Sequence, residues 1–150
     1  MKKISLLLLV LVLTFSVISV NQVKAEGVVP IFLPNYEIGQ NLEGDLFPVY
    51  RAIDGKTPIT DTVRKILGGK IDLWERAMGF HSEWSSDHNV ELVGVDLKEG
   101  VLRIELSDPD NFTQGGSYRV RSKRSQIEKT VKQFESVEEV EFLPETLFQP

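Results

Sequence analysis

The sequence predicts an α+β fold in which two main helices pack on one face of a small, mostly antiparallel sheet. Two stretches repeat their apolar residues every three or four positions, which is the period of an amphipathic helix. Several shorter stretches alternate apolar and polar residues, which is the period of a half-buried strand. The predicted order is strand, strand, helix, short helix, strand, strand, helix, strand. Because the connections are long, this order favours helices gathered on one side of the sheet.

Two short strands are expected at the start of the domain. Residues 28–33 form an apolar run, and Pro30 within it has no N–H to donate, so this strand is expected at a sheet edge. Residues 47–53 form the second strand, and its apolar side chains share one face: Phe47, Val49 and Ile53. Asp54 and Gly55 then supply a turn.

The first main helix is expected over residues 57–67. Thr57 can cap its N-terminus, and Pro58 can occupy the first helical position, where its missing N–H costs nothing. One apolar stripe follows at helical spacing: Ile59, Val63, Ile66 and Leu67. Gly68 is expected to end the helix in the left-handed conformation.

The middle of the chain is expected to hold a short helix and a hairpin. The helix covers residues 72–79, where Asp72 and Glu75 make a capping-box-like pair. The hairpin covers residues 90–106, in which two alternating runs are joined by Lys98-Glu99-Gly100. These three residues fit a three-residue loop with its Gly in the left-handed conformation.

The chain is expected to end in a helix that is followed at once by a strand. The helix is expected to begin at Ser117, with Ser125 as the alternative start. One helical face carries apolar side chains spaced four and three residues apart: Ile127, Val131 and Phe134. After residue 136 the period drops to two, and Val140 and Phe142 alternate with glutamates, which predicts a half-buried strand.

The first 25 residues are predicted to be a secretory signal peptide. Lys2 and Lys3 form a positively charged start, and residues 6–20 form an apolar core. Val23-Lys24-Ala25 has the small-x-small pattern of a cleavage site, so the cut is expected after Ala25. The alternative is an uncleaved membrane anchor, because the apolar run is only just short of the ~18–20 residues that a span needs.

Removal of this segment leaves residues 26–150, an ordinary size for one domain with its own core. The whole chain carries a net charge of −5, and residues 1–25 contain three lysines and no acids, so the remaining domain carries −8. A mildly acidic domain gives no reason to expect nucleic acid as a partner. The chain has no Cys, so neither a disulfide nor a lipid-modified N-terminal cysteine can form.

Several motifs, taken in order, resemble the GerMN domain of sporulation and spore germination. Residues 130–140 have roughly the family's ending, a Thr followed by regularly spaced apolar residues. Residues 63–69 resemble its paired apolar residues followed by Gly, and residues 75–82 resemble its E-x-x-x-G-apolar-x-S stretch. Residues 92–106 match its hairpin, and Phe112 matches the aromatic residue that follows.

The resemblance implies a non-enzymatic domain outside the membrane of a spore-forming or related bacterium. It also implies a fold similar to the ring-building domains of secretion and sporulation complexes. Two features depart from the family pattern. Leu143-Pro144-Glu145 stands where members often have a Gly after the last strand, and the chain shows neither the lipid anchor nor the tandem repeat that are common in the family.

Four potential metal ligands lie within eight residues of one another: His81, Glu83, Asp87 and His88. Zinc accepts such ligands, so the alternative function is a metal-dependent hydrolase of the cell wall. The spacing is neither helical nor that of a hairpin, so a polar loop is preferred, and no metal, cofactor or catalytic residue is expected. Ser85 or Ser86 could pair with His81 as nucleophile and base, but the chain lacks the strand–turn–helix elbow. The flanking Trp74 and Trp84 are expected in the core or a groove.

The candidate interaction residues form a basic run: Arg119, Arg121, Lys123 and Arg124. The alternative is an ordinary solvated helix face. On an acidic protein, a positive surface could contact an acidic partner, an identical subunit or an anionic wall polymer. The run is followed by five glutamates, at positions 135, 138, 139, 141 and 145, which could join copies head to tail.

The expected function is therefore that of a secreted, non-catalytic scaffold or binding domain in the cell envelope. Its expected partners are envelope or sporulation proteins, or further copies of itself. A small binder of a cell-wall polymer, with no role in assembly, is the third possibility. A membrane partner is expected only if the N-terminal segment stays uncleaved.

Overall fold

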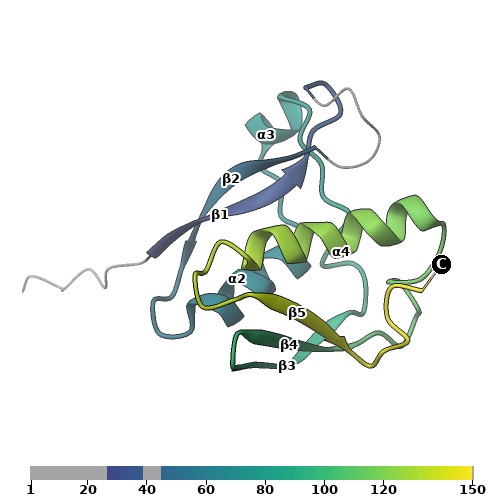
Figure 1. The fold of residues 1–150 in the computed structure, drawn as a ribbon. Helices are drawn as coiled ribbons and strands as arrows, with labels where there is room; N and C mark the ends of the chain where they lie inside the picture. The colour runs from purple at the N-terminus through teal and green to yellow at the C-terminus, as the bar shows by residue number, and fades with distance from the viewer. Residues whose placement is uncertain (1–26, 39–44, 150) are drawn as a thin grey trace, which may run out of the picture.

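A computed structural model of the protein describes residues 27–38 and 45–149, and Figure 1 shows its fold. The predicted signal peptide and its cleavage after Ala25 lie outside the described residues. The elements follow the predicted order: β1 (Gly27–Pro34), β2 (Leu46–Ile53), α2 (Pro58–Leu67), α3 (Leu73–Ala77), β3 (Glu91–Lys98), β4 (Val101–Ser107), α4 (Ser117–Val131) and β5 (Glu139–Leu143).

The strands form two sheets, whereas the sequence predicts one. β1 and β2 pair antiparallel, from Gly27 opposite Ile53 to Pro34 opposite Leu46. The second sheet has the order β3-β4-β5, in which β3 and β4 are antiparallel and β4 and β5 are parallel. The α+β class and the mostly antiparallel pairing are confirmed.

Side chains of α4 and of the turn after it occupy the outer edge of β1, which explains why the two sheets stay separate. The N–H of Phe32 donates to Thr130 Oγ1 at 3.0 Å, and Gln133 Nε2 donates to the carbonyl of Pro30 at 2.8 Å. Backbone groups that are already paired in this way are not available to a further strand. Pro30 has no N–H to pair, and its position at an edge is as predicted.

The helices α2 and α4 lie between the β1–β2 hairpin and the three-stranded sheet, as Figure 1 shows. Val63 on α2, Ile127 on α4 and Leu102 on β4 are all fully buried at this junction. The two helices thus cover one face of the three-stranded sheet, as predicted. The opposite face is polar, and there Arg103 Nε lies 2.8 Å from Glu141 Oε2.

The core is continuous across both sheets and both main helices. Its buried apolar members extend from Ile31 to Phe148 along the sequence. Residues 27–38 and 45–149 therefore share one hydrophobic core. Within this described part of the chain, no helix is long and apolar enough to cross a membrane.

The helix α2 forms where it is predicted, but its two ends differ from the prediction. Among the described residues, the side chain of Thr57 makes no capping hydrogen bond. Gly68 stays in the right-handed region with φ −66°, and the left-handed residue is Gly69 with φ +57°. A Cβ at position 69 would lie 1.8 Å from the carbonyl oxygen of Trp84. Both the close approach and the positive φ therefore require Gly69.

The β3–β4 hairpin has a two-residue loop, so the predicted three-residue loop is wrong. Lys98 pairs directly with Val101, which leaves Glu99 and Gly100 to turn the chain. Their φ values are +51° and +82°, the pair of positive angles that a type I′ turn needs. The twist of this turn matches that of the flanking strands, which explains why Glu99 adopts the left-handed conformation.

The helix α4 begins at Ser117, as predicted, and ends at Val131. Phe134 is predicted on the same helical face but lies in the following turn, where its N–H donates to the carbonyl of Val131 at 3.1 Å. It is half-buried and packs against the core from there. Val140 and Phe142 are buried on β5, which confirms the predicted alternation.

Candidate interaction surfaces

The structure does not gather the two histidines of the 81–88 segment around one point. The ring of His81 lies against Tyr36, with 4.7 Å between centroids, whereas His88 stacks on Phe112 at 3.6 Å. Within residues 27–38 and 45–149, no group of three or more His, Cys, Asp or Glu side chains is placed to hold a metal ion. The segment has no regular helix or hairpin spacing that could make four ligands converge.

The two serines of the same segment line an open hollow of about 530 Å³, between the end of α2 and the start of β3. Ser85 Oγ accepts a hydrogen bond from the backbone N–H of Asp87 at 3.2 Å. His88 and Arg64 also line the hollow, but His81 does not. The hollow therefore does not hold the serine and histidine pair that the sequence leaves open.

The basic run does not form one uniform surface. Arg119, Arg121 and Arg124 are exposed, whereas Lys123 is only 1% exposed. The ammonium group of Lys123 donates to the carbonyl of Phe112 and lies 3.8 Å from the centroid of its ring. Burial, together with the nearby charge of Arg119, lowers the pKa of Lys123. Lys123 therefore packs inside the domain, which corrects its assignment to an exposed surface.

A signal for the burial of Lys123 is present in the sequence. Val120, Lys123 and Ile127 stand at i, i+3 and i+7, so the lysine shares the inward face of α4. Grouping the four cations by sequence alone hides this difference. Of the three exposed arginines, Arg121 and Arg124 lie only about 60° apart around α4, whereas Arg119 lies about 140° or more away from them. The arginine surface named below consists of Arg121 and Arg124.

The arginine surface lies along the first half of α4, and Arg119 lies in the first turn of the same helix. Arg119 Nε lies 3.7 Å from Glu83 Oε2, and Arg124 Nε lies 2.8 Å from Glu128 Oε1. The guanidinium of Arg124 also lies 5.5 Å from the centroid of the Phe142 ring. These contacts hold the cations against the domain while leaving them accessible, since both side chains are about half exposed or more.

The five glutamates after the run do not form one cluster. Glu135 and Glu138 lie in the turn after α4, and Glu139 begins β5, so all three follow the C-terminal end of the helix. Glu141 pairs with Arg103 across the sheet. Glu145 follows β5. The negative end of the domain thus consists of Glu135, Glu138 and Glu139.

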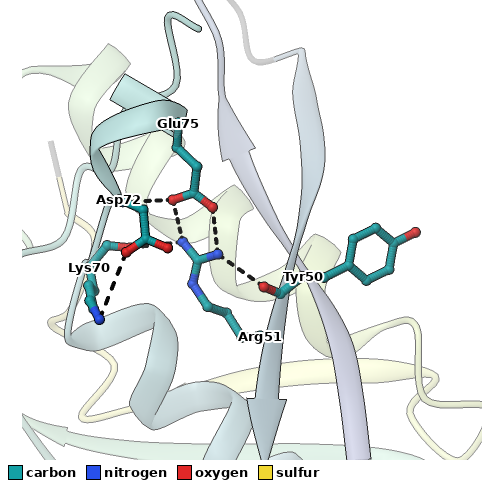
Figure 2. A network of polar contacts seen from close by, with 5 residues as sticks. All are labelled: Tyr50, Arg51, Lys70, Asp72 and Glu75. Carbon is teal, nitrogen blue, oxygen red and sulfur yellow. Dashed lines mark hydrogen bonds and ion pairs between the residues drawn. The ribbon is translucent and has the colours of Figure 1, made fainter. Parts of the chain in front are cut away.

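A buried ion pair fixes the short helix α3 on β2, as Figure 2 shows. Arg51 Nη1 lies 2.6 Å from Glu75 Oε1, and Arg51 Nη2 lies 2.6 Å from Glu75 Oε2. Glu75 is fully buried. The same carboxylate accepts the backbone N–H of Asp72 at 2.9 Å, which completes the predicted capping box. Burial acts to raise the pKa of Glu75, but hydrogen bonds from Arg51 and Asp72 outweigh it and lower the pKa.

Three apolar side chains at α3 point into solvent, which the sequence does not predict. Leu73 is 87% exposed, Trp74 57% and Met78 53%. Trp84 is buried in the core, as predicted, and its Nε1–H donates to the carbonyl of Lys123 at 3.2 Å. The prediction that Trp74 is also buried is wrong, because α3 turns the face that carries Glu75 toward β2.

Comparison with known proteins identifies a family model and similar solved structures. Residues 32–145 match the family model Germane, described as sporulation and spore germination. A structure of the tandem GerMN domains of the sporulation protein GerM from Bacillus subtilis is similar, with a TM-score of 0.59 at 17% identity. That similarity covers 86% of this chain and 43% of that chain. The first GerMN domain of GerM from Bacillus subtilis gives 0.54 at 12% identity, covering 77% and 80%.

This chain spans less than half the length of the tandem structure. No curated protein sequence matches it. The two structural similarities show the fold, and the family model extends from β1 to the segment after β5, so it includes both helices and both sheets. The chain belongs to the Germane family of sporulation and spore germination.

Proposed function

We propose that this domain acts outside the cytoplasmic membrane as a non-catalytic binding domain in sporulation or spore germination. Membership of the Germane family supports the process, and the signal-peptide pattern of residues 1–25 supports the location. The binding is proposed to take place through the arginine surface. Its partner is an acidic surface of another envelope or sporulation protein.

The position of the arginines on α4 is the observation that carries this proposal. The N-terminal end of a helix dipole is positive, so acidic side chains normally stabilise the first turn and cations destabilise it by a few tenths of a kcal/mol. The first turn of α4 contains no acid, and Arg119 is its third residue. The helix dipole therefore does not explain Arg119, and it does not extend to Arg121 and Arg124. The exposure of Arg121 and Arg124 on one side of α4 offers two guanidinium groups to an anionic partner.

The positive helix end and the arginines act in the same direction on an anionic partner. A partner that carries carboxylates could accept bidentate hydrogen bonds from Arg121 and Arg124, which are strong and directional. The whole chain is acidic, with a net charge of −5, so the positive sign of this surface is local. Its contribution to binding should weaken as salt is added.

Two other anionic partners would use the same surface. A second copy could present Glu135, Glu138 and Glu139, which follow the C-terminal end of α4, and such head-to-tail contacts can repeat. An anionic wall polymer could present repeated phosphates or carboxylates. Light scattering across concentrations detects the first of these, and sedimentation with purified cell wall detects the second.

The test uses charge reversal. In the double variant R121E/R124E, two positive charges are replaced by two negative ones, and attraction to an acidic surface becomes repulsion. The matched control K65E/K98E makes the same change of charge at two exposed lysines elsewhere. Capture of partners from a native envelope extract should fail for the first variant and persist for the second. Zinc analysis of the purified protein tests the hydrolase alternative.

A further inference from the structure

An apolar tip projects from one end of the molecule around α3. It consists of Leu73, Trp74 and Met78, together with Ile38 in the neighbouring turn, and each of these side chains is more than half exposed. Their combined exposed surface is on the order of 500 Å², the size at which an apolar patch on a monomer usually has a function. Figure 1 shows α3 at the end of the molecule away from the three-stranded sheet.

The apolar face of α3 follows from its helical geometry. With about 100° per residue, Leu73, Trp74 and Ala77 lie within one arc of the helix, and Glu75 lies on the opposite side. Glu75 is fixed by Arg51, as Figure 2 shows, so the arc must face outward. The exposure of Leu73 and Trp74 is therefore a consequence of the buried ion pair between Arg51 and Glu75, and it does not result from fraying of the helix end.

The turn beside α3 is fixed as firmly. Asn35 Nδ2 donates to the carbonyl of Met78 at 2.8 Å, and Asn35 Oδ1 accepts the backbone N–H of Ile38 at 3.2 Å. Asn35 also forms a β-bridge with Phe80. The buried side chain of Asn35 thus joins the two segments that carry the apolar tip. Because these segments are already ordered, little conformational entropy is lost when the tip binds a partner.

The described charges around the tip nearly cancel, which favours an electrically neutral surface as its partner. Lys70 is 82% exposed on one side of α3, and Arg76 is exposed on another. Of the acids, Glu75 is neutralised by Arg51 and Asp72 lies 3.8 Å from Lys70. Glu37 in the adjoining turn and Asp45 before β2 are exposed acids, so these described charges nearly balance the two cations.

The shape and size of the tip favour a lipid surface over a protein. A stable protein interface buries about 800 Å² on each partner, more than the apolar tip offers. A lipid interface, by contrast, accepts a small convex tip to a depth of ~5–10 Å, comparable with the length of about 7.5 Å of the five-residue α3.

We propose that the apolar tip inserts Leu73, Trp74 and Met78 into the interfacial region of a phospholipid bilayer. Trp is enriched at membrane–water interfaces. The charged ends of Lys70 and Arg76 can remain at the level of the headgroups. The bilayer then orients the domain and leaves the arginine surface on α4 for another partner. This contact needs no membrane-spanning segment.

The test uses residues 26–150 and vesicles of phosphatidylcholine, with and without phosphatidylglycerol. Insertion should shift the fluorescence of Trp74 to shorter wavelength, because its ring leaves water, while the buried Trp84 stays constant. The protein should also sediment with the vesicles. The variant L73Q/M78Q should weaken sedimentation by about tenfold or more, since it removes two inserted apolar groups. The control V93Q changes an apolar residue that is 59% exposed on β3, and it should bind like wild type.

Two further variants make the outcome decisive. W74F should keep most of the sedimentation but lose the spectral shift, which assigns the shift to Trp74. R121E/R124E should keep the shift on phosphatidylcholine vesicles, so failure of the arginine surface and failure of the apolar tip can be told apart. The proposal is overturned if the wild type binds neither vesicle, or if L73Q/M78Q binds as well as V93Q. It is also overturned if the wild type self-associates in light scattering and L73Q/M78Q does not.

Discussion

Arg51 and Glu75 form a bidentate ion pair in which both nitrogen–oxygen distances are 2.6 Å and the carboxylate is fully buried. Arg51 comes from β2, and Glu75 comes from the one-and-a-half turns of α3. A helix this short cannot form on its own in water, because nucleation is unfavourable and few hydrogen bonds repay it. The pair therefore determines where α3 lies and which of its faces is exposed.

Removal of one partner of this pair should be strongly destabilising. In E75A the guanidinium of Arg51 loses its counter-ion in a site where it is only 16% exposed. We expect a loss of about 3 kcal/mol or more in the free energy of unfolding, measured in urea. R103A, which breaks a half-exposed pair with Glu141, should cost about 1 kcal/mol or less. Equal losses for the two variants would contradict the role assigned to the buried pair.

Acid should weaken the protein partly through Glu75, whose pKa is lower in the folded protein than its ordinary value of 4.5. Such a carboxyl stabilises the fold above its unfolded pKa, and this contribution is lost as the pH falls through the folded pKa. The difference in unfolding free energy between wild type and E75Q should therefore be constant near neutral pH and shrink below about pH 4.5. A difference that stays the same down to pH 3 would be inconsistent with this assignment.

Core substitutions should follow the observed burial and not the predicted helix face. Ile127 is fully buried on α4, so I127A should destabilise by about 2–5 kcal/mol in denaturant melts. Phe134 is half-buried in the turn after α4, so F134A should cost less than the ~3–5 kcal/mol of a fully buried Phe. The exposed Glu139 provides the reference, because E139A should stay within about 0.5 kcal/mol.

The local elements could be predicted from the sequence because their signals are local. Pro58 and the apolar stripe after it place α2 correctly, and Asp72 with Glu75 places the start of α3. The two-residue turn at Glu99 is missed because its left-handed conformation is imposed by strand twist and not by residue type. The division into two sheets depends on the contact between Thr130 and Phe32, which are far apart in the sequence.

The surfaces were harder to predict, because exposure depends on what a residue faces in three dimensions. Lys123 is buried because Phe112 supplies both a carbonyl and a ring for its ammonium group. Trp74 is exposed because Arg51 draws the opposite side of α3 inward. Neither partner is a neighbour in sequence. The helical spacing of Lys123 predicts its burial. The exposure of Leu73 and Trp74 cannot be predicted in this way, because a five-residue helix is too short to show a periodic pattern.

Export should remove the N-terminal segment. Val23-Lys24-Ala25 follows the apolar run directly, so the mature protein should begin near Glu26. N-terminal sequencing of the exported protein checks this. Recovery of the chain from the membrane fraction with Met1 or Lys2 at its start would instead indicate an uncleaved anchor.

Capture of native partners by charge-reversed protein tests the account most directly. Wild type and the control K65E/K98E should retain the same acidic protein from an envelope extract, and the amount should fall as salt is raised. R121E/R124E should retain about tenfold less or lower, because like charges in a close interface cost several kcal/mol. Undiminished capture by R121E/R124E would contradict the arginine surface as the binding site of this domain.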